Sequence, residues 1–158
     1  AGSTRDLSWT LASAGTLFYE IKATNASSSY TLDQWVTQPA GPCQPDRFEP
    51  NDDKATAASV NEAILTSLRL CGDEDRDVFS ITVDAPRQLS IMTSHEPDWG
   101  YSDIYLYKSD GTTLIDSSLD FDIGATLEVL IEEDGLYYIE IIPFDVLMLP
   151  YDLAILME

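Results

Sequence analysis

The chain has 158 residues, which is enough for one domain with a hydrophobic core. Its 28 acidic and 8 basic side chains give a formal net charge of −20, so nucleic acids and anionic membranes are excluded as favourable partners. No apolar run reaches the roughly 20 residues that a membrane-spanning helix needs, and membrane insertion is not expected. The acidic excess also has a plain interpretation, because charge of one sign keeps a protein surface soluble.

The first 37 residues are predicted to be the last strands of a preceding, partial repeat. LSWTLASAGTLFYEIKATNASSSYTLDQW near the start is similar to LEVLIEEDGLYYIEIIPFDVLMLPYDLAIL near the end. Gly, aromatic and Glu positions coincide in the pairs Gly15/Gly135, Phe18/Tyr138 and Glu20/Glu140. We expect a Pro/Gly linker over 38–45 and a complete domain over 46–158. The alternative is that two β-sandwich endings look alike because both end in hairpins.

The two cysteines, Cys43 and Cys71, flank the start of the complete domain. Their spacing is not a metal-binding motif, and a disulfide between them is the favoured interpretation. Two unpaired, buried thiols are the alternative. A disulfide would stabilise the chain by roughly 3–4 kcal/mol and would indicate an oxidising compartment.

The elements that follow are predicted to be almost all strands. The segment NDDKATAASVNEA alone is typical of a short helix, with Asn51 or Asp52 as its N-cap. Seven β-type segments rich in branched and aromatic residues come next: 77–85, 87–94, 102–111, 112–118, 125–133, 135–143 and 150–158. Asp110-Gly111 predicts a hairpin turn. The fold class is therefore all-β, a jelly-roll-like antiparallel β-sandwich with one short helical turn.

Two acidic clusters stand beside the two cysteines. The first holds Glu49, Asn51, Asp52 and Asp53, and the second holds Asp73, Glu74, Asp75 and Asp77. A disulfide would bring both clusters together, and the repulsion would then favour a bound cation. Calcium fits best, because it takes six to eight oxygen ligands in flexible geometry. The alternative is a solvated acidic rim with helix capping. An EF-hand is excluded, because Val78 stands where that loop needs glycine.

Five blocks in order resemble the bacterial pre-peptidase C-terminal domain family. They are DRFEPNDDKATAASV, CGDEDRDVFSITV, SDIYLYKSDGTTLIDSS, DGLYYIEI and YDLAI. The resemblance covers about 46–156 in order and 7–36 in part. It implies a jelly-roll-like sandwich that serves as a non-catalytic accessory domain, often in tandem, in secreted bacterial proteases and other surface proteins.

The related collagen-binding domains of clostridial collagenases bind calcium near the start of the domain. By position, the resemblance implies Glu49, Asn51 and Asp52 as ligands of Ca²⁺, with Asp75 or Asp77 from the second cluster. Those relatives carry a further acidic ligand two residues before the Glu, where this chain has Arg47. The sequence therefore departs from the family pattern at one ligand position.

Catalysis is not expected. The chain has one histidine and neither a nucleophile elbow nor a phosphate-binding glycine loop. Binding is the stronger class, and Trp99 and Tyr101 are the candidate contact residues, although most aromatic side chains of such a domain pack in the sheets.

These observations favour a calcium-stabilised accessory domain, secreted or at the cell surface of a bacterium, that binds an extracellular protein or polysaccharide. Other domains of a larger parent protein are expected partners. The alternative is a structural spacer or assembly module whose N-terminal strands pack on another domain or chain.

Overall fold

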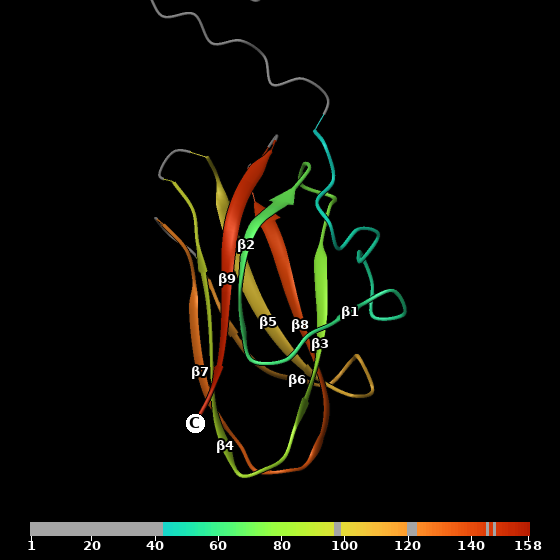
Figure 1. Ribbon diagram of the computed structural model, residues 1–158, viewed down its shortest axis with the longest axis vertical. Helices are drawn as coiled ribbons and strands as arrows, with labels where there is room; N and C mark the ends of the chain where they lie inside the picture. Colours follow the sequence, from blue (N-terminus) through green and yellow to red (C-terminus); the bar gives the residue numbers. More distant parts are fainter. Residues whose placement is uncertain (1–42, 97–98, 120–122, 145, 147) are drawn as a thin grey trace, which may run out of the picture. The chain divides into compact units, whose positions relative to one another are not determined.

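The computed structural model describes residues 43–96, 99–119, 123–144, 146 and 148–158 (Figure 1). Within these residues the chain forms nine strands in two sheets that pack face to face. The predicted partial repeat over 1–37 and the start of the linker lie outside the described residues. The proposed domain boundaries therefore stay a prediction.

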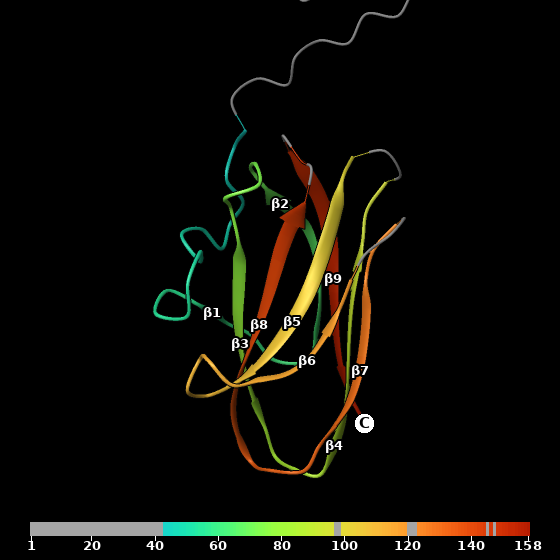
Figure 2. The same cartoon turned by 180° about the vertical axis from the view of Figure 1, so that it is seen from behind.

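The five-stranded sheet lies in front in Figure 2, with the strand order β1-β3-β8-β5-β6. Its members are β1 (Ala58–Ser59), β3 (Asp77–Val83), β8 (Gly135–Phe144), β5 (Tyr101–Lys108) and β6 (Leu114–Ser118). The β1–β3 pairing is parallel and the other three are antiparallel.

The four-stranded sheet lies in front in Figure 1, with the strand order β2-β9-β4-β7. Its members are β2 (Ala63–Leu70), β9 (Leu149–Met157), β4 (Arg87–Ser94) and β7 (Thr126–Ile131). All its pairings are antiparallel. A bulge interrupts β2, where Ser67 has a φ of 61° and its N–H donates to Asp152 Oδ1 at 2.9 Å.

The core lies between the two sheets. Side chains of a strand alternate between its faces, so every second residue of β3, β8, β5, β4 and β9 points inward. The largest fully buried side chains include Leu68, Leu70, Phe79, Ile81, Leu89, Ile91, Ile104, Leu106, Leu127, Ile139, Ile141 and Leu149. Burying this apolar surface is the main favourable contribution to folding.

The predicted all-β sandwich is confirmed, and β3 to β9 lie close to the seven predicted β-type segments. The sequence analysis missed β2, and β1 lies within the segment that was predicted to be helical. The short helix is wrong. The described residues contain no helix, and therefore none that could span a membrane. A single turn replaces the helix: Asp53 O accepts from Thr56 N–H at 3.2 Å, and Asp53 Oδ1 accepts from Ala55 N–H at 2.8 Å. Asp53 caps this turn, rather than Asn51 or Asp52 capping a helix.

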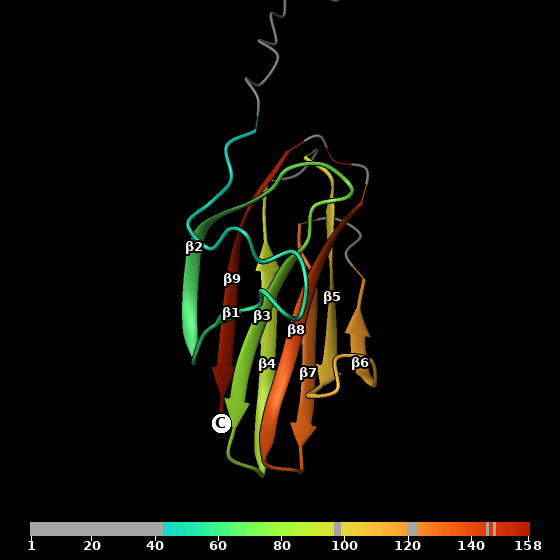
Figure 3. The same ribbon diagram turned by 90° about the vertical axis from the view of Figure 1, so that its right-hand side faces the viewer.

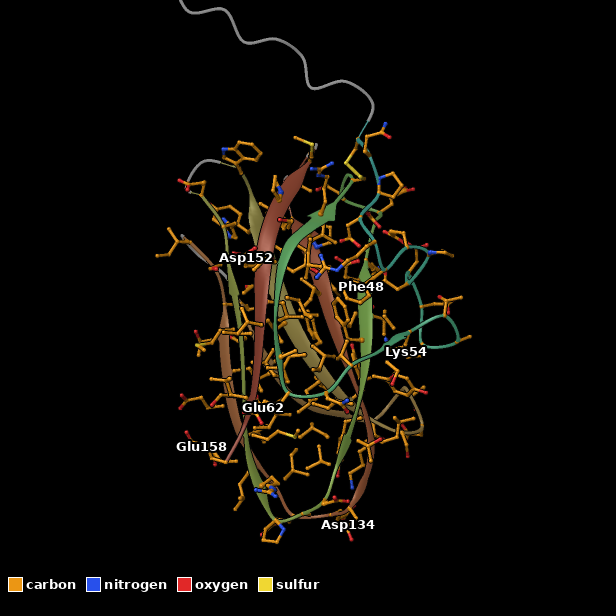
Figure 4. The ribbon with its side chains drawn as sticks, viewed as in Figure 1. Phe48, Lys54, Glu62, Asp134, Asp152 and Glu158 are labelled. Carbon is orange, nitrogen blue, oxygen red and sulfur yellow. A yellow bond between two sulfur atoms is a disulfide. The ribbon has the colours of Figure 1, made fainter. Side chains whose placement is uncertain are left out.

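The segment 43–57 runs beside β3 and covers that edge of the sheet (Figure 3). Val78 N–H donates to Asn51 O at 2.8 Å, and just after β1 the Val60 N–H donates to Ser80 O at 2.9 Å. Phe48, labelled in Figure 4, packs edge-on against Phe79 with ring centroids 5.6 Å apart. These contacts hold the first acidic cluster against the start of β3.

Candidate metal centre

Three carboxylates from the two acidic clusters meet at one end of the sandwich. Glu49, Asp52 and Asp75 each offer an oxygen, and these oxygens all lie within 4.8 Å of one another. Glu49 and Asp75 are half-buried and Asp52 is exposed. We call these three residues the carboxylate cluster. It lies in an open hollow that is also lined by Cys43, Pro45, Pro50 and Cys71.

A disulfide joins Cys43 to Cys71, the pairing that the sequence favoured, with a Cα–Cα distance of 5.5 Å. It brings the chain before Glu49 next to the chain before Asp75. The Cys71 N–H donates to Asp75 Oδ2 at 2.5 Å, so the cysteine backbone also orients a cluster carboxylate. The disulfide and this hydrogen bond therefore help to hold the two acidic clusters together.

The electrostatics of the cluster disfavour its full ionisation. Burial raises the pKa of Glu49, and the charges of Asp75 and Asp52 raise it further. Burial likewise raises the pKa of Asp75, and Asp52 adds to this through a hydrogen bond and its charge. Hydrogen bonds from the Asn51 N–H to Glu49 and from the Cys71 N–H to Asp75 lower the two pKa values, because they stabilise the ionised carboxylates. Three acids in this geometry favour either bound protons or a cation.

Asn51 is fully buried between the two cluster acids of its segment. Its backbone N–H donates to Glu49 Oε2 at 3.0 Å, and its Nδ2 donates to Val78 O at 3.5 Å. Its Oδ1 is buried and accepts no hydrogen bond from the described residues. A buried amide oxygen without a donor is costly, and it is a ligand type that calcium accepts.

Asp77 lies beside the cluster but is not one of its three acids. It is fully buried, and its Oδ2 accepts a hydrogen bond from the Tyr151 hydroxyl. Burial raises the pKa of Asp77 to about 7; the Tyr151 hydroxyl lowers it, and the charges of Asp46, Asp75 and Glu49 raise it. Its Oδ1 has no hydrogen-bond partner among the described residues.

The second acidic cluster thus divides into different roles. Asp75 joins the carboxylate cluster, Asp77 is held by Tyr151, and Asp73 Oδ1 accepts from Val146 N–H at 2.8 Å. Sequence spacing could not separate these three aspartates, because the partners of Asp77 and Asp73 lie 74 and 73 residues away in the chain, whereas Asp75 accepts from Cys71, only four residues away.

Asp46 and Arg47, which precede Glu49 in the chain, have roles that the sequence analysis missed or left open. Asp46 Oδ1 accepts from Phe48 N–H at 2.8 Å, and its Oδ2 accepts from Arg69 N–H at 2.9 Å. Arg47 Nη1 donates to Thr66 O at 2.7 Å, and its guanidinium lies 4.7 Å from the Phe48 ring centroid. Arg47, where the chain departs from the family pattern, therefore anchors the segment to β2.

The candidate binding residues Trp99 and Tyr101 are 44% and 36% exposed. Tyr101 lies opposite Phe144 in the β5–β8 ladder, and Phe144 is 67% exposed. Sequence reasoning missed Phe144, although it continues the outward-facing alternation of β8 from Tyr138. Together Tyr101 and Phe144 give the outer face of the five-stranded sheet an apolar end.

The same face carries an aromatic pair and a buried ion pair. Tyr105 and Tyr107 stack with ring centroids 6.5 Å apart, and Lys54 Nζ lies 4.2 Å from the Tyr107 centroid. Lys54, labelled in Figure 4 on the segment before β1, also pairs with Glu140 Oε2. Arg76 Nη1 pairs with Glu140 Oε1 at 3.0 Å. The nearly buried Glu140 is thus neutralised by two cations.

Part of the chain matches the model of a known protein family. Residues 75–143 match the model of the bacterial pre-peptidase C-terminal domain, a range that runs from β3 to the last residue but one of β8 and does not include Glu49, Asn51 or Asp52. No curated protein sequence matches the chain significantly.

Two solved structures are similar. The pre-peptidase C-terminal domain of collagenase from Bacillus anthracis is 20% identical, with 63% of this chain and 94% of that chain covered and a TM-score of 0.49. Aeromonas hydrophila PliG, a periplasmic lysozyme inhibitor of g-type lysozyme, is 13% identical, with 65% and 97% covered and a TM-score of 0.46. The family model alone confirms the predicted resemblance to the bacterial pre-peptidase C-terminal domain family, over residues 75–143 of the chain.

Proposed function

We propose that the chain is a non-catalytic accessory domain of a secreted bacterial protein, stabilised by Ca²⁺ at the carboxylate cluster. The observation that carries the proposal is the meeting of Glu49, Asp52 and Asp75 oxygens within 4.8 Å of one another. The family match over residues 75–143 supports the accessory role. The disulfide supports an extracellular or cell-surface location, because disulfides persist in oxidising compartments.

The chemistry of the residues fits calcium. The cluster supplies three hard, anionic oxygens, and the hollow around them is open, so water molecules can complete the six to eight ligands that calcium takes. The Oδ1 atoms of Asn51 and Asp77 have no hydrogen-bond partner in the described part of the chain and are further candidate oxygens. Magnesium fits less well, because it requires a strict octahedron and few protein ligands.

The proposed cation would fasten the segment 43–57 to the sandwich. Glu49 and Asp52 belong to that segment, whereas Asp75 belongs to the turn before β3. A ligand that binds only the folded arrangement stabilises it, by about 2.7 kcal/mol at a hundredfold excess over Kd. Calcium would therefore stabilise the joint at which the domain begins.

Thermal unfolding in calcium and in excess chelator, under non-reducing conditions, tests the metal. We expect calcium to raise the midpoint by several degrees, and the Glu49→Gln/Asp52→Asn variant to lose this shift. Glu128→Gln is the matched control, since it removes one exposed acid on β7, far along the chain from the cluster. No shift at millimolar calcium would refute the metal.

For the binding role, we propose that the exposed Trp99, Tyr101 and Phe144 contact an extracellular protein or polysaccharide. Their aromatic surfaces give large contact areas at low entropic cost. Sedimentation with insoluble collagen and with insoluble polysaccharides checks this role. The Trp99→Ala/Tyr101→Ala variant should release the chain, whereas Leu114→Ala, an exposed apolar change on β6, should not. The spacer role is favoured if no polymer retains the wild-type chain.

A further inference from the structure

The disulfide closes a loop around part of the carboxylate cluster. Its cysteines are 28 residues apart, and Glu49 and Asp52 lie within the loop. Asp75 lies just beyond the second cysteine, whose N–H it accepts at 2.5 Å. Both cysteines also line the hollow that holds the three acids. The disulfide therefore lies directly beside the carboxylate cluster.

We propose that the disulfide and the cation site are coupled: Ca²⁺ binds more tightly when Cys43 and Cys71 are joined, and bound Ca²⁺ protects this bond from reduction. The inference rests on the proposed calcium site. It adds a redox control that would distinguish the domain inside a reducing cytosol from the domain outside the cell, where the bond persists.

The coupling has a physical origin in the order that the bond imposes. An intact bond holds the chain before Glu49 and the turn before Asp75 at one point, with a Cα–Cα distance of 5.5 Å. The acids are then already close before the cation binds, and less freedom is lost on binding. Without the bond, repulsion among Glu49, Asp52 and Asp75 can separate the two segments.

Other contacts limit the size of the effect. Arg69 Nη1 donates to Gln44 O at 3.0 Å, Asp46 Oδ2 accepts from Arg69 N–H at 2.9 Å, and Arg47 binds Thr66 O. These bonds tie the segment to β2 whether or not the cysteines are joined. We therefore expect a loss of about tenfold in calcium affinity rather than its abolition, within the range of ordinary coupling between sites.

The reduction itself is a thiol–disulfide exchange. An external dithiol breaks the Cys43–Cys71 bond and transfers two electrons to its sulfur atoms, which take up two protons at neutral pH to give two thiols. The dithiol becomes a disulfide. Because linkage between two equilibria is reciprocal, saturating calcium should shift this reduction equilibrium by the same factor of about ten.

Calorimetric titration of the full chain with CaCl₂, in about 0.15 M salt to screen the acidic surface, tests whether Ca²⁺ binds more tightly when the disulfide is intact. We expect the Cys43→Ser/Cys71→Ser variant to bind about tenfold more weakly than the oxidised chain. Val83→Ala, a buried change at the opposite end of β3 from Asp77, is the control for general destabilisation and should keep the wild-type Kd.

Reduction of the native chain in dithiothreitol redox buffers, with calcium or with chelator, tests whether bound Ca²⁺ protects the disulfide. This experiment does not require the serine variant to fold. Calcium should move the reduction midpoint, and Glu49→Gln/Asp52→Asn should abolish this movement. If the oxidised chain binds no calcium, the proposed function itself fails. If it binds, but the reduced and oxidised chains bind equally and the midpoint does not move, the coupling alone is wrong.

Discussion

The carboxylate cluster and the surroundings of Glu140 are two regions that solve the same problem differently. Glu140 is 5% exposed and lies between Lys54 and Arg76, so its charge is compensated by the chain itself. The cluster gathers Glu49, Asp52 and Asp75 with no ion pair among the described residues. The chain thus places two of its eight basic side chains at Glu140, and no ion pair in the described part of the chain offsets the charge of the cluster.

We expect the strongest change in stability at Glu140. Glu140→Ala removes the shared partner of Lys54 and Arg76, whose side chains are 27% and 43% exposed, so water recovers part of the cost of breaking the pairs. We expect the free energy of unfolding to fall by about 2 to 3 kcal/mol, as measured by urea denaturation. A loss below about 0.5 kcal/mol would place Glu140 among ordinary surface acids and remove the contrast with the cluster.

The acids at and beside the carboxylate cluster should make the stability of the domain depend on pH. The folded-state pKa of Asp77 is raised to about 7, and burial also raises the pKa values of Glu49 and Asp75. The folded state therefore holds more protons than the unfolded state, and stability falls as pH rises toward neutrality. Without calcium, we expect about 2 kcal/mol to be lost between about pH 5 and 8, since one pKa unit corresponds to about 1.4 kcal/mol.

Asp77→Asn is the variant that isolates this effect. Its amide oxygen can still accept from the Tyr151 hydroxyl, as the protonated acid does. Urea denaturation as a function of pH should give a flatter profile for the variant than for the wild type. An unchanged slope would show that Asp77 ionises freely in the folded chain.

A smaller effect is expected for Lys54→Met. The substitution removes one of the two ion pairs of Glu140 but keeps an apolar side chain over the Tyr107 ring. Because Arg76 remains, we expect a loss of about 1 kcal/mol in the free energy of unfolding. The loss should vanish in the Glu140→Gln background, which a double-mutant cycle measures.

The smallest effect is expected for Glu49→Gln in chelator near neutral pH. Removing one of three neighbouring acids relieves repulsion, but the cluster is open to solvent, which screens it. We expect a gain of about 0.5 kcal/mol, in the direction opposite to that for Glu140→Ala. A loss of stability would mean that Glu49 acts mainly through its hydrogen bond from the Asn51 N–H.

Local patterns explain why much of the fold was predictable. Alternation along 87–94, for example, places Leu89 and Ile91 on one face, and the structure buries both. The same reasoning failed over 51–63, where alanines indicated a helix. There the chain pairs with the edge of β3, through the bonds of Asn51 with Val78 and of Val60 with Ser80. These long-range backbone hydrogen bonds override the local helix propensity.

Local alternation and turn residues were enough to predict the all-β class and the seven strands from β3 to β9. Counting left one possible pairing for the two cysteines, and the structure shows that they are joined. The folded chain was needed to show that Asp75, and not Asp77, joins Glu49 and Asp52, and that Asp77 is held by Tyr151. These outcomes depend on contacts between segments far apart in the chain, which local patterns do not encode. The exposure of Phe144, in contrast, follows from the alternation along β8 and could have been predicted.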